Sequence, residues 1–111
     1  MAISEDFLQI YRGDTYTIQI TVTDYLGAAF NLTNYIATFT AKSGTTEAIS
    51  VDKACTTAPL SGIEEIVLSS VNTDVVIKIY DYDIQIANTD IPPIVYTIAR
   101  SKLSILRDIT T

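Results

Sequence analysis

The amino-acid sequence predicts an all-β fold, and three observations carry that prediction. Ile, Val, Thr and Tyr dominate the chain, whereas Ala, Leu, Glu and Lys do not accumulate at helical spacing. Branched and aromatic side chains pack well on a pleated surface and are enriched in strands. Apolar and polar residues alternate in several short segments, which is the period of a half-buried strand. Turn-forming residues recur about every 8–12 residues, which is typical of a sandwich of about seven antiparallel strands.

The clearest strand is predicted over residues 16–23, after a short first strand over residues 7–11. One face of this strand carries polar residues rich in hydroxyl groups, and the opposite face is apolar. Asp24 to Gly27 form the turn that ends the strand. This alternation indicates an antiparallel strand with one buried face. The apolar face is supplied by every second residue, namely Tyr16, Ile18, Ile20 and Val22.

Five further strands follow, and three of them have special features. The strand over 48–52 is expected at an edge of a sheet, and it leads into a loose segment holding Pro59 and Gly62. The pair Glu64-Glu65 interrupts the alternation of the next strand, and residues 69–74 form a polar crossover with room for one helical turn. The last strand changes its apolar face, so we expect a bulge near Arg100-Ser101. The five predicted strands cover residues 35–42, 48–52, 63–68, 80–86 and 94–105.

This pattern predicts a single immunoglobulin-like β-sandwich domain over residues 1–111. The Cys and Trp signature of antibody domains is missing, because Cys55 is the only cysteine and the chain has no Trp. No intramolecular disulfide is therefore possible, and the domain must be stabilised by packing. Tyr82 is a candidate for the tyrosine-corner residue of such a sandwich.

Charge and hydropathy exclude two classes of partner. The net charge is −6, with seven basic residues and no His, so the surface repels a phosphate backbone and we expect no nucleic-acid binding. No apolar run approaches the ~18 residues that span a bilayer. The first six residues lack a basic segment followed by an apolar one, so we expect no secretory signal and synthesis in a cytoplasm.

Two short motifs have functional meanings in other proteins. Arg12-Gly13-Asp14 matches an integrin-binding tripeptide, but it lies directly between two predicted strands, where Gly and Asp favour a turn. Asn31-Leu32-Thr33 is a formal glycosylation acceptor, which requires a secretion signal to be used. We therefore interpret both motifs as turn-forming segments.

Catalytic and metal sites are difficult to assemble from these residues. Asp81 and Asp83 share one strand face, but Ca²⁺ needs six to eight oxygen ligands, so we interpret them as solvated polar residues. The chain has no His for a triad or a zinc site, no phosphate-binding loop and no thiol beside a base. The prediction is a protein that is not an enzyme, with no cofactor and no metal, and no binding residue can be assigned.

Aromatic residues near strand ends are the remaining candidates for contacts. Phe7, Tyr11, Tyr25 and Phe30 lie near predicted turns, where aromatic side chains often anchor protein interfaces. The alternative is that they seal the ends of the sandwich.

Several short blocks follow one another through nearly the whole chain. They are Tyr11-Arg12-Gly13-Asp14-Thr15, Val22-Thr23-Asp24 to Gly27, Asn31-Leu32-Thr33, Gly62-Ile63, Thr73, Tyr80-Asp81-Tyr82-Asp83-Ile84, and Tyr96-Thr97-Ile98 to Asp108-Ile109-Thr110. Together they resemble the immunoglobulin-like N-terminal domain of phage baseplate upper proteins and related small phage tail proteins. Two positions depart from that family, since Lys78 and Ser101 stand where glycines are usual.

The resemblance implies a virion structural protein of a phage or prophage, assembled in the bacterial host cytoplasm. Its partners would be other tail or baseplate proteins, and it would form homo-oligomers in the particle. Family members usually continue into receptor-binding regions, whereas this sequence ends soon after its last predicted strand. We therefore expect it to act as an adaptor or decoration unit. The alternative hypothesis is a carbohydrate-binding β-sandwich that recognises host-surface glycans through exposed residues such as Tyr25 and Tyr96.

Overall fold

The computed structural model describes residues 6–107, and these residues form the all-β sandwich that the sequence predicts. Two sheets pack face to face, and the one helical element among the described residues is the short 3-10 turn η1. The elements are β1 (Leu8–Tyr11), β2 (Tyr16–Thr21), β3 (Tyr35–Ser43), β4 (Thr46–Ala54), η1 (Pro59–Ser61), β5 (Ile63–Leu68), β6 (Ile79–Asn88) and β7 (Val95–Leu106).

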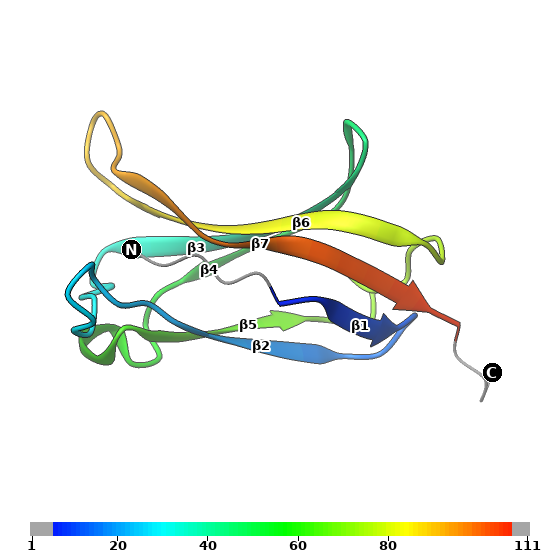
Figure 1. The fold of residues 1–111 in the computed structure, drawn as a ribbon, viewed down its shortest axis with the longest axis horizontal. Helices are drawn as coiled ribbons and strands as arrows, with labels where there is room; N and C mark the ends of the chain where they lie inside the picture. The colour runs from blue at the N-terminus through cyan, green and yellow to red at the C-terminus, as the bar shows by residue number, and fades with distance from the viewer. Residues whose placement is uncertain (1–5, 108–111) are drawn as a thin grey trace.

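One sheet is larger than the other. Its five strands follow the order β1-β7-β6-β3-β4, while β2 and β5 form the second sheet (Figure 1). Every pair is antiparallel except β1 and β7, which run parallel, so the expectation of antiparallel strands throughout is wrong for this pair. No hairpin joins β1 to β7, and after β1 the chain crosses to the other sheet, so no tight turn imposes opposite directions on them.

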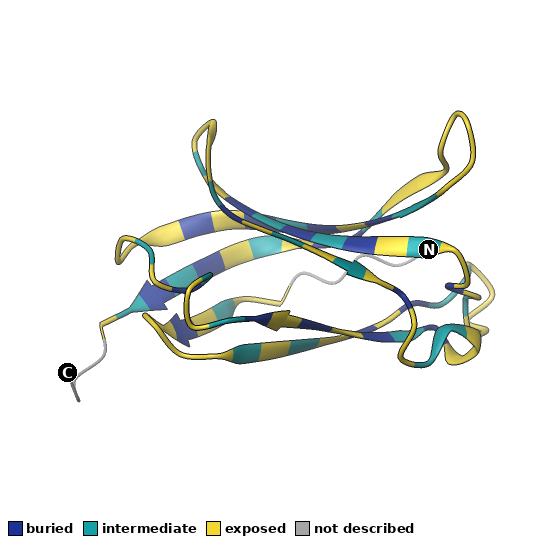
Figure 2. Cartoon of the chain, turned by 180° about the vertical axis from the view of Figure 1, so that it is seen from behind, coloured by how far each residue is buried: buried dark blue, intermediate teal, exposed yellow. Residues whose placement is uncertain are grey.

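The core lies between the two sheets and is built from alternating residues of each strand. Buried and exposed residues alternate along the ribbons in Figure 2. The alternation predicted for β2 is confirmed, since Ile20 and Val22 are buried while Thr17, Gln19 and Thr21 are exposed. The largest fully buried apolar side chains are Leu32, Phe39, Ile66, Leu68, Tyr80, Ile84, Ile86, Leu103 and Ile105.

Three features of the strands differ from the expectation. β4 does lie at a sheet edge, but it is nine residues long because it pairs along the whole of β3. The bulge of β7 lies at Ile98 and Ala99, slightly before the predicted position, and both of these residues are buried. Residues 59–62 are not loose, because η1 and Gly62 are fixed by backbone hydrogen bonds.

The alternation of β5 continues through the two glutamates. Glu64 points into the core with Ile66 and Leu68, whereas Glu65 is exposed. The predicted interruption is therefore wrong, because an inward charge is accommodated by hydrogen bonds described below.

The tyrosine corner is formed by Tyr80 and not by Tyr82. The Tyr80 hydroxyl donates to the Val76 carbonyl oxygen at 2.6 Å, four residues upstream, which is the local bond that defines this motif. The Tyr82 hydroxyl instead donates to the carbonyl oxygen of Asp6 at 2.5 Å, since β1 lies beside β7 at this point. Tyr82 also stacks on Phe39, with ring centroids 5.4 Å apart.

The strands run along the long axis, whose extent is 43 Å, so the molecule has two distinct ends. We call the end formed by residues 22–34, 55–62 and 89–94 the loop end. The opposite end, formed by residues 12–15, 44–45 and 69–78, is the crossover end. None of the helical structure in residues 6–107 is long and apolar enough to cross a membrane.

Candidate functional site

The loop end presents apolar side chains at the tips of its loops. Tyr25 and Leu26 are 83% and 77% exposed, Leu60 is 75% exposed, and Ile91 in the β6–β7 connection is 99% exposed. Apolar side chains this exposed at rigid loop tips are candidates for protein contacts. Tyr25, which the sequence predicts to lie near a turn as a candidate contact residue, is exposed at this end.

Asp24 fixes the turn that carries Tyr25 and Leu26. Its Oδ1 atom accepts hydrogen bonds from the backbone N–H groups of Leu26 and Ala28, at 2.9 and 3.0 Å. The Gly27 N–H donates to the Asp24 carbonyl oxygen at 3.0 Å. A short acidic side chain that accepts bonds from its own turn reduces the turn's freedom, so the apolar tip stands on an ordered base.

Gly62 ties two loops of this end together. It adopts a left-handed conformation with φ +69°, and a Cβ atom built on it would lie 2.3 Å from the Val22 carbonyl oxygen. The Val22 N–H donates to the Gly62 carbonyl oxygen at 2.7 Å, and the Leu32 N–H donates to that of Pro59 at 2.9 Å. Only glycine fits this close approach of two backbones without strain.

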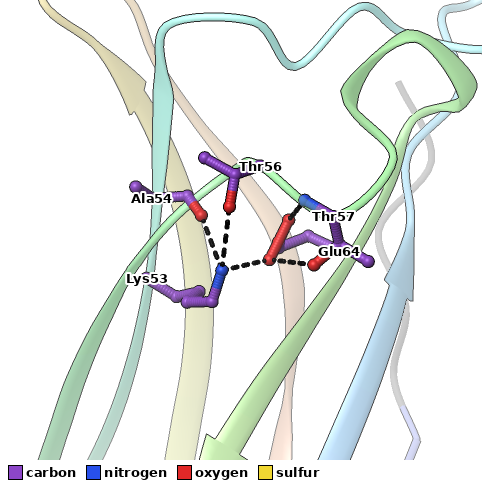
Figure 3. Close-up of polar contacts among 5 residues, drawn as sticks. All are labelled: Lys53, Ala54, Thr56, Thr57 and Glu64. Carbon is purple, nitrogen blue, oxygen red and sulfur yellow. Dashed lines mark hydrogen bonds and ion pairs between the residues drawn. The ribbon is translucent and has the colours of Figure 1, made fainter.

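A polar cluster around the buried Glu64 closes the sandwich between β4 and β5 (Figure 3). The Glu64 side chain has no exposed surface, and its Oε1 accepts from Lys53 Nζ and the Thr57 hydroxyl, both at 2.8 Å. Glu64 Oε2 accepts from the Thr57 N–H at 2.9 Å, and Lys53 Nζ also donates to the Ala54 carbonyl oxygen at 3.0 Å. Each carboxylate oxygen thus has a donor, and the segment after β4 is bound to the start of β5.

These donors keep Glu64 ionised inside the protein. Burial alone would raise the pKa of its carboxyl group, but the hydrogen bonds from Lys53 and Thr57 and the Lys53 charge lower that pKa to about 2. Neighbouring Cys55 is buried, and burial followed by the Glu64 charge raises the pKa of its thiol. A raised thiol pKa opposes nucleophilic reactivity. We therefore assign this cluster a structural role, which is to connect the segment after β4 to β5.

Aromatic rings seal the inner side of the loop end. Phe30 lies edge-to-face with Tyr35 and with Tyr96, at centroid distances of 5.4 and 5.9 Å. Burial first, and then Tyr96 and Asp90, raise the pKa of the Tyr35 hydroxyl. Of the four aromatic candidates, Phe30 therefore has the sealing role, while Phe7 and Tyr11 are each 50% exposed.

The two short motifs both form turns, as the sequence predicts. Gly13 has φ +83°, the Asp14 N–H donates to the Tyr11 carbonyl oxygen at 3.1 Å, and Arg12 Nε pairs with Asp74 at 2.9 Å. The Arg12 charge is thus directed to the crossover segment. In the second motif the Thr33 N–H donates to Asn31 Oδ1 at 3.0 Å, and Leu32 is fully buried.

The crossover end has its own apolar surface, and it is hollowed. Val71, Val76 and Ile79 are more than half exposed. A hollow of about 600 Å³ is lined by Val71 and Ile77 together with Arg12 and Arg107. A second hollow, of about 430 Å³, is lined by Val76, Lys78 and Tyr80 among others. The Arg12–Asp74 pair borders both hollows.

The outer face of the five-stranded sheet is polar. Asp81 and Asp83 both lie on it, Asp81 pairs with Lys102, and Asp83 lies opposite Arg100 in the ladder. Among residues 6–107 no group of three or more Asp, Glu, Cys or His side chains could hold a metal ion. The arrangement of these carboxylates is that of a solvated sheet face with cross-strand charge pairs.

Some of these features had no signal in the sequence. The Glu64 cluster joins residues 53, 57 and 64, whose proximity depends on how β4 and β5 approach each other from different sheets. The first hollow likewise forms only where the segments after β1 and β7 meet the crossover. The second forms only where the crossover meets the turn between β3 and β4. The exposed Tyr25 and Leu26 were detectable, because apolar residues inside an Asp-to-Gly turn cannot all be buried.

Comparison with known proteins shows likeness of fold at low sequence identity. No protein-family model matches the chain, and no curated protein matches its sequence. The N-terminal domain of ORF48 of phage TP901-1 has a similar structure, with a TM-score of 0.62 at 10% identity over 95% of this chain and 89% of that chain. A second similar structure comes from photo-crosslinking analyses of multimeric cell-adhesive interactions of VGSC beta subunits, with a TM-score of 0.52 at 13% identity over 94% and 93% of the two chains.

Proposed function

We propose that this chain is a non-enzymatic structural protein of a phage or prophage tail or baseplate. It acts as an adaptor or decoration unit, as a single immunoglobulin-like domain, through contacts with other tail or baseplate proteins. The observation that carries the proposal is the likeness to a domain of a phage protein over 95% of the chain, together with the sequence blocks that resemble baseplate upper proteins. Its place would be the virion, after assembly in the host cytoplasm.

The surface supports a role in protein contacts. Apolar side chains are exposed at both ends of the long axis, and at the loop end they stand on turns held by Asp24 and Gly62. An ordered apolar surface loses little conformational entropy when a partner covers it. A module with a contact surface at each end has the geometry of an adaptor.

The proposed role is tested by looking for the domain in phage particles and for its binding partners. We expect cryo-electron microscopy of tails from the producing phage to contain density for the domain, and pull-down with the purified protein to recover tail or baseplate proteins. The same pull-down with Leu26→Asp and Ile91→Asp introduced together should recover less of the loop-end partner. A protein present in no particle and bound by no tail component would overturn the proposal.

The carbohydrate-binding alternative depends on Tyr25 and Tyr96. Tyr25 stands at a loop tip, whereas Tyr96 is 39% exposed and packs against Phe30, so the two do not form one flat row. A glycan array distinguishes the two functions. Reproducible binding that Tyr25→Ala or Tyr96→Ala abolishes would favour the glycan module.

A further inference from the structure

We propose that the loop end of one copy binds the crossover end of a second copy, so that the chain associates head to tail. This self-association rests on the structural role proposed above, since it names a second copy as one partner of the two ends. It involves two different surfaces, in contrast to the pairing of identical surfaces in a symmetric dimer. Four observations support it.

The first observation is the shape of the two ends. The loop end has projecting apolar tips at Leu26 and Ile91, and they lie on separate connections. The crossover end has two hollows, one lined by Val71 and the other by Val76. Both hollows have mixed linings, in which Val71 or Val76 provides apolar surface beside the charged Arg12 and Asp74. Projecting apolar groups on one surface and hollows with an apolar part on another are the elements of a heterologous contact.

The second observation is the distribution of basic residues in the described chain. Only Lys53 lies toward the loop end, and it is engaged by the buried Glu64. Arg100 lies near the middle of β7, opposite Asp83. All other basic residues of residues 6–107 lie toward the crossover end, namely Arg12, Lys42, Lys78, Lys102 and Arg107.

The third observation is the position of the acidic residues. Asp90 adjoins the Ile91 tip and is exposed, and Asp24 holds the turn that carries Leu26. At the crossover end Asp74 and Asp81 are already paired with Arg12 and Lys102. Asp14 and Glu47 also lie there, so that end is mixed in sign while the loop end is acidic. Two acidic ends repel each other, whereas an end of mixed sign can offer its basic residues to an acidic end, so contact between unlike ends is favoured over contact between two loop ends.

The fourth observation concerns another possible self-contact, at the free edge of β4. Lys53 on this strand points inward toward Glu64. A bulge also interrupts the ladder between β3 and β4, at Ala41 and Lys42 of β3. Inward charges and bulges are features that protect an edge strand from pairing with another chain. The β4 edge is therefore a poorer surface for self-association than the two ends.

Sedimentation velocity of the purified chain tests the proposal directly. We expect the mean sedimentation coefficient to rise with concentration beyond that of a dimer, because each added copy offers a new free end. Higher salt should weaken the association, since part of the attraction is between charges. A chain that stays monomeric at every concentration and at low salt would overturn the inference.

Two variants and their mixture separate head-to-tail association from other modes. Leu26→Asp with Ile91→Asp blocks the loop end, and Val71→Asp with Val76→Asp blocks the crossover end. Each variant alone should lose at least about tenfold in association constant, the effect of losing one apolar anchor. Their mixture should form a one-to-one dimer that grows no further, because one intact end of each kind remains.

A substitution on a surface that belongs to neither end serves as the control. Val67→Asp, on the outer side of β5, should associate like the parent chain. A mixture that stays monomeric, a blocked variant that still associates alone, or a loss of association in Val67→Asp would each contradict the inference. These tests use only the purified chain, so they are independent of the proposed function. If the unmodified chain does not self-associate but still binds tail proteins, the inference is overturned and the proposed function stands.

Discussion

The Lys53–Glu64 pair near the loop end and the Lys102–Asp81 pair toward the crossover end have the same chemistry in opposite surroundings. The Glu64 side chain is fully buried and has two further donors from Thr57, whereas the Asp81 side chain is 64% exposed. Water competes for the exposed pair, and such pairs contribute about 0–1 kcal/mol. Losing a partner from the buried pair leaves a charge without compensation. The structure of the loop end therefore depends on the polar contacts of the buried Glu64.

The largest expected effect is at Gly62, where two backbone segments of the loop end approach each other closely. Gly62→Ala places a methyl group against the Val22 carbonyl oxygen in a left-handed conformation, so we expect a loss of about 4 kcal/mol in the free energy of unfolding. Urea denaturation measures it. Gly27→Ala is the matched control, because φ is also positive there but the space is open, and about 1 kcal/mol is expected. Equal losses in the two variants would contradict the role of crowding.

Removing one partner of the buried pair has the next largest effect. Lys53→Met keeps the apolar stem but leaves the Glu64 carboxylate buried with Thr57 alone, so we expect a loss of about 3 kcal/mol at neutral pH. Lys102→Met, at the exposed pair, should cost no more than about 0.5 kcal/mol. Similar losses for the two variants in denaturant titrations would contradict the comparison.

The stabilisation that Glu64 provides should also depend on pH. The folded pKa of Glu64 is about 2, below the ordinary 4.5, so its stabilisation is present above pH 4.5 and is lost as pH falls toward 2. A shift of this size corresponds to about 3 kcal/mol. Unfolding measured across this range should show a steeper loss in the parent chain than in Glu64→Gln. Parallel profiles for the two proteins would argue against an ionised Glu64 in the fold.

A smaller effect is expected at the tyrosine corner near the crossover end. Tyr80→Phe removes the hydrogen bond to the Val76 carbonyl oxygen, but Val76 is exposed and water can replace the donor, so the expected loss is about 1 kcal/mol. Tyr11→Phe, at a half-exposed ring, should change stability by less than about 0.5 kcal/mol. A thermal melt of both variants distinguishes these outcomes.

Local patterns were sufficient to predict most of the fold. The alternation of β2 and β6 and the turn at Asp24 depend on residues close in sequence, and the structure confirms them. The parallel pairing of β1 with β7 joins residues about ninety-five positions apart, such as Leu8 and Leu103. Nothing local encodes such a pairing, so it was expected to be antiparallel like the rest.

The errors at Glu64 and Tyr82 have a common physical cause. A glutamate in a strand is usually exposed, and its inward position is possible only because Lys53 and Thr57 supply donors from elsewhere. Tyr80 and Tyr82 both point inward from β6, so periodicity cannot distinguish them. Their roles depend on which carbonyl oxygen each hydroxyl reaches, Val76 for one and Asp6 for the other.

The parallel pairing of β1 and β7 also predicts how the domain bears a mechanical load. Residues 8–11 and 103–106 run side by side in the same direction, so a pull backward on Leu8 and forward on Leu106 slides one strand along the other. All the hydrogen bonds between the two strands then resist together, whereas a hairpin peeled from its end breaks them one at a time. We expect force spectroscopy with handles at residues 8 and 106 to show a higher rupture force than handles at residues 79 and 106, which peel apart the antiparallel β6 and β7.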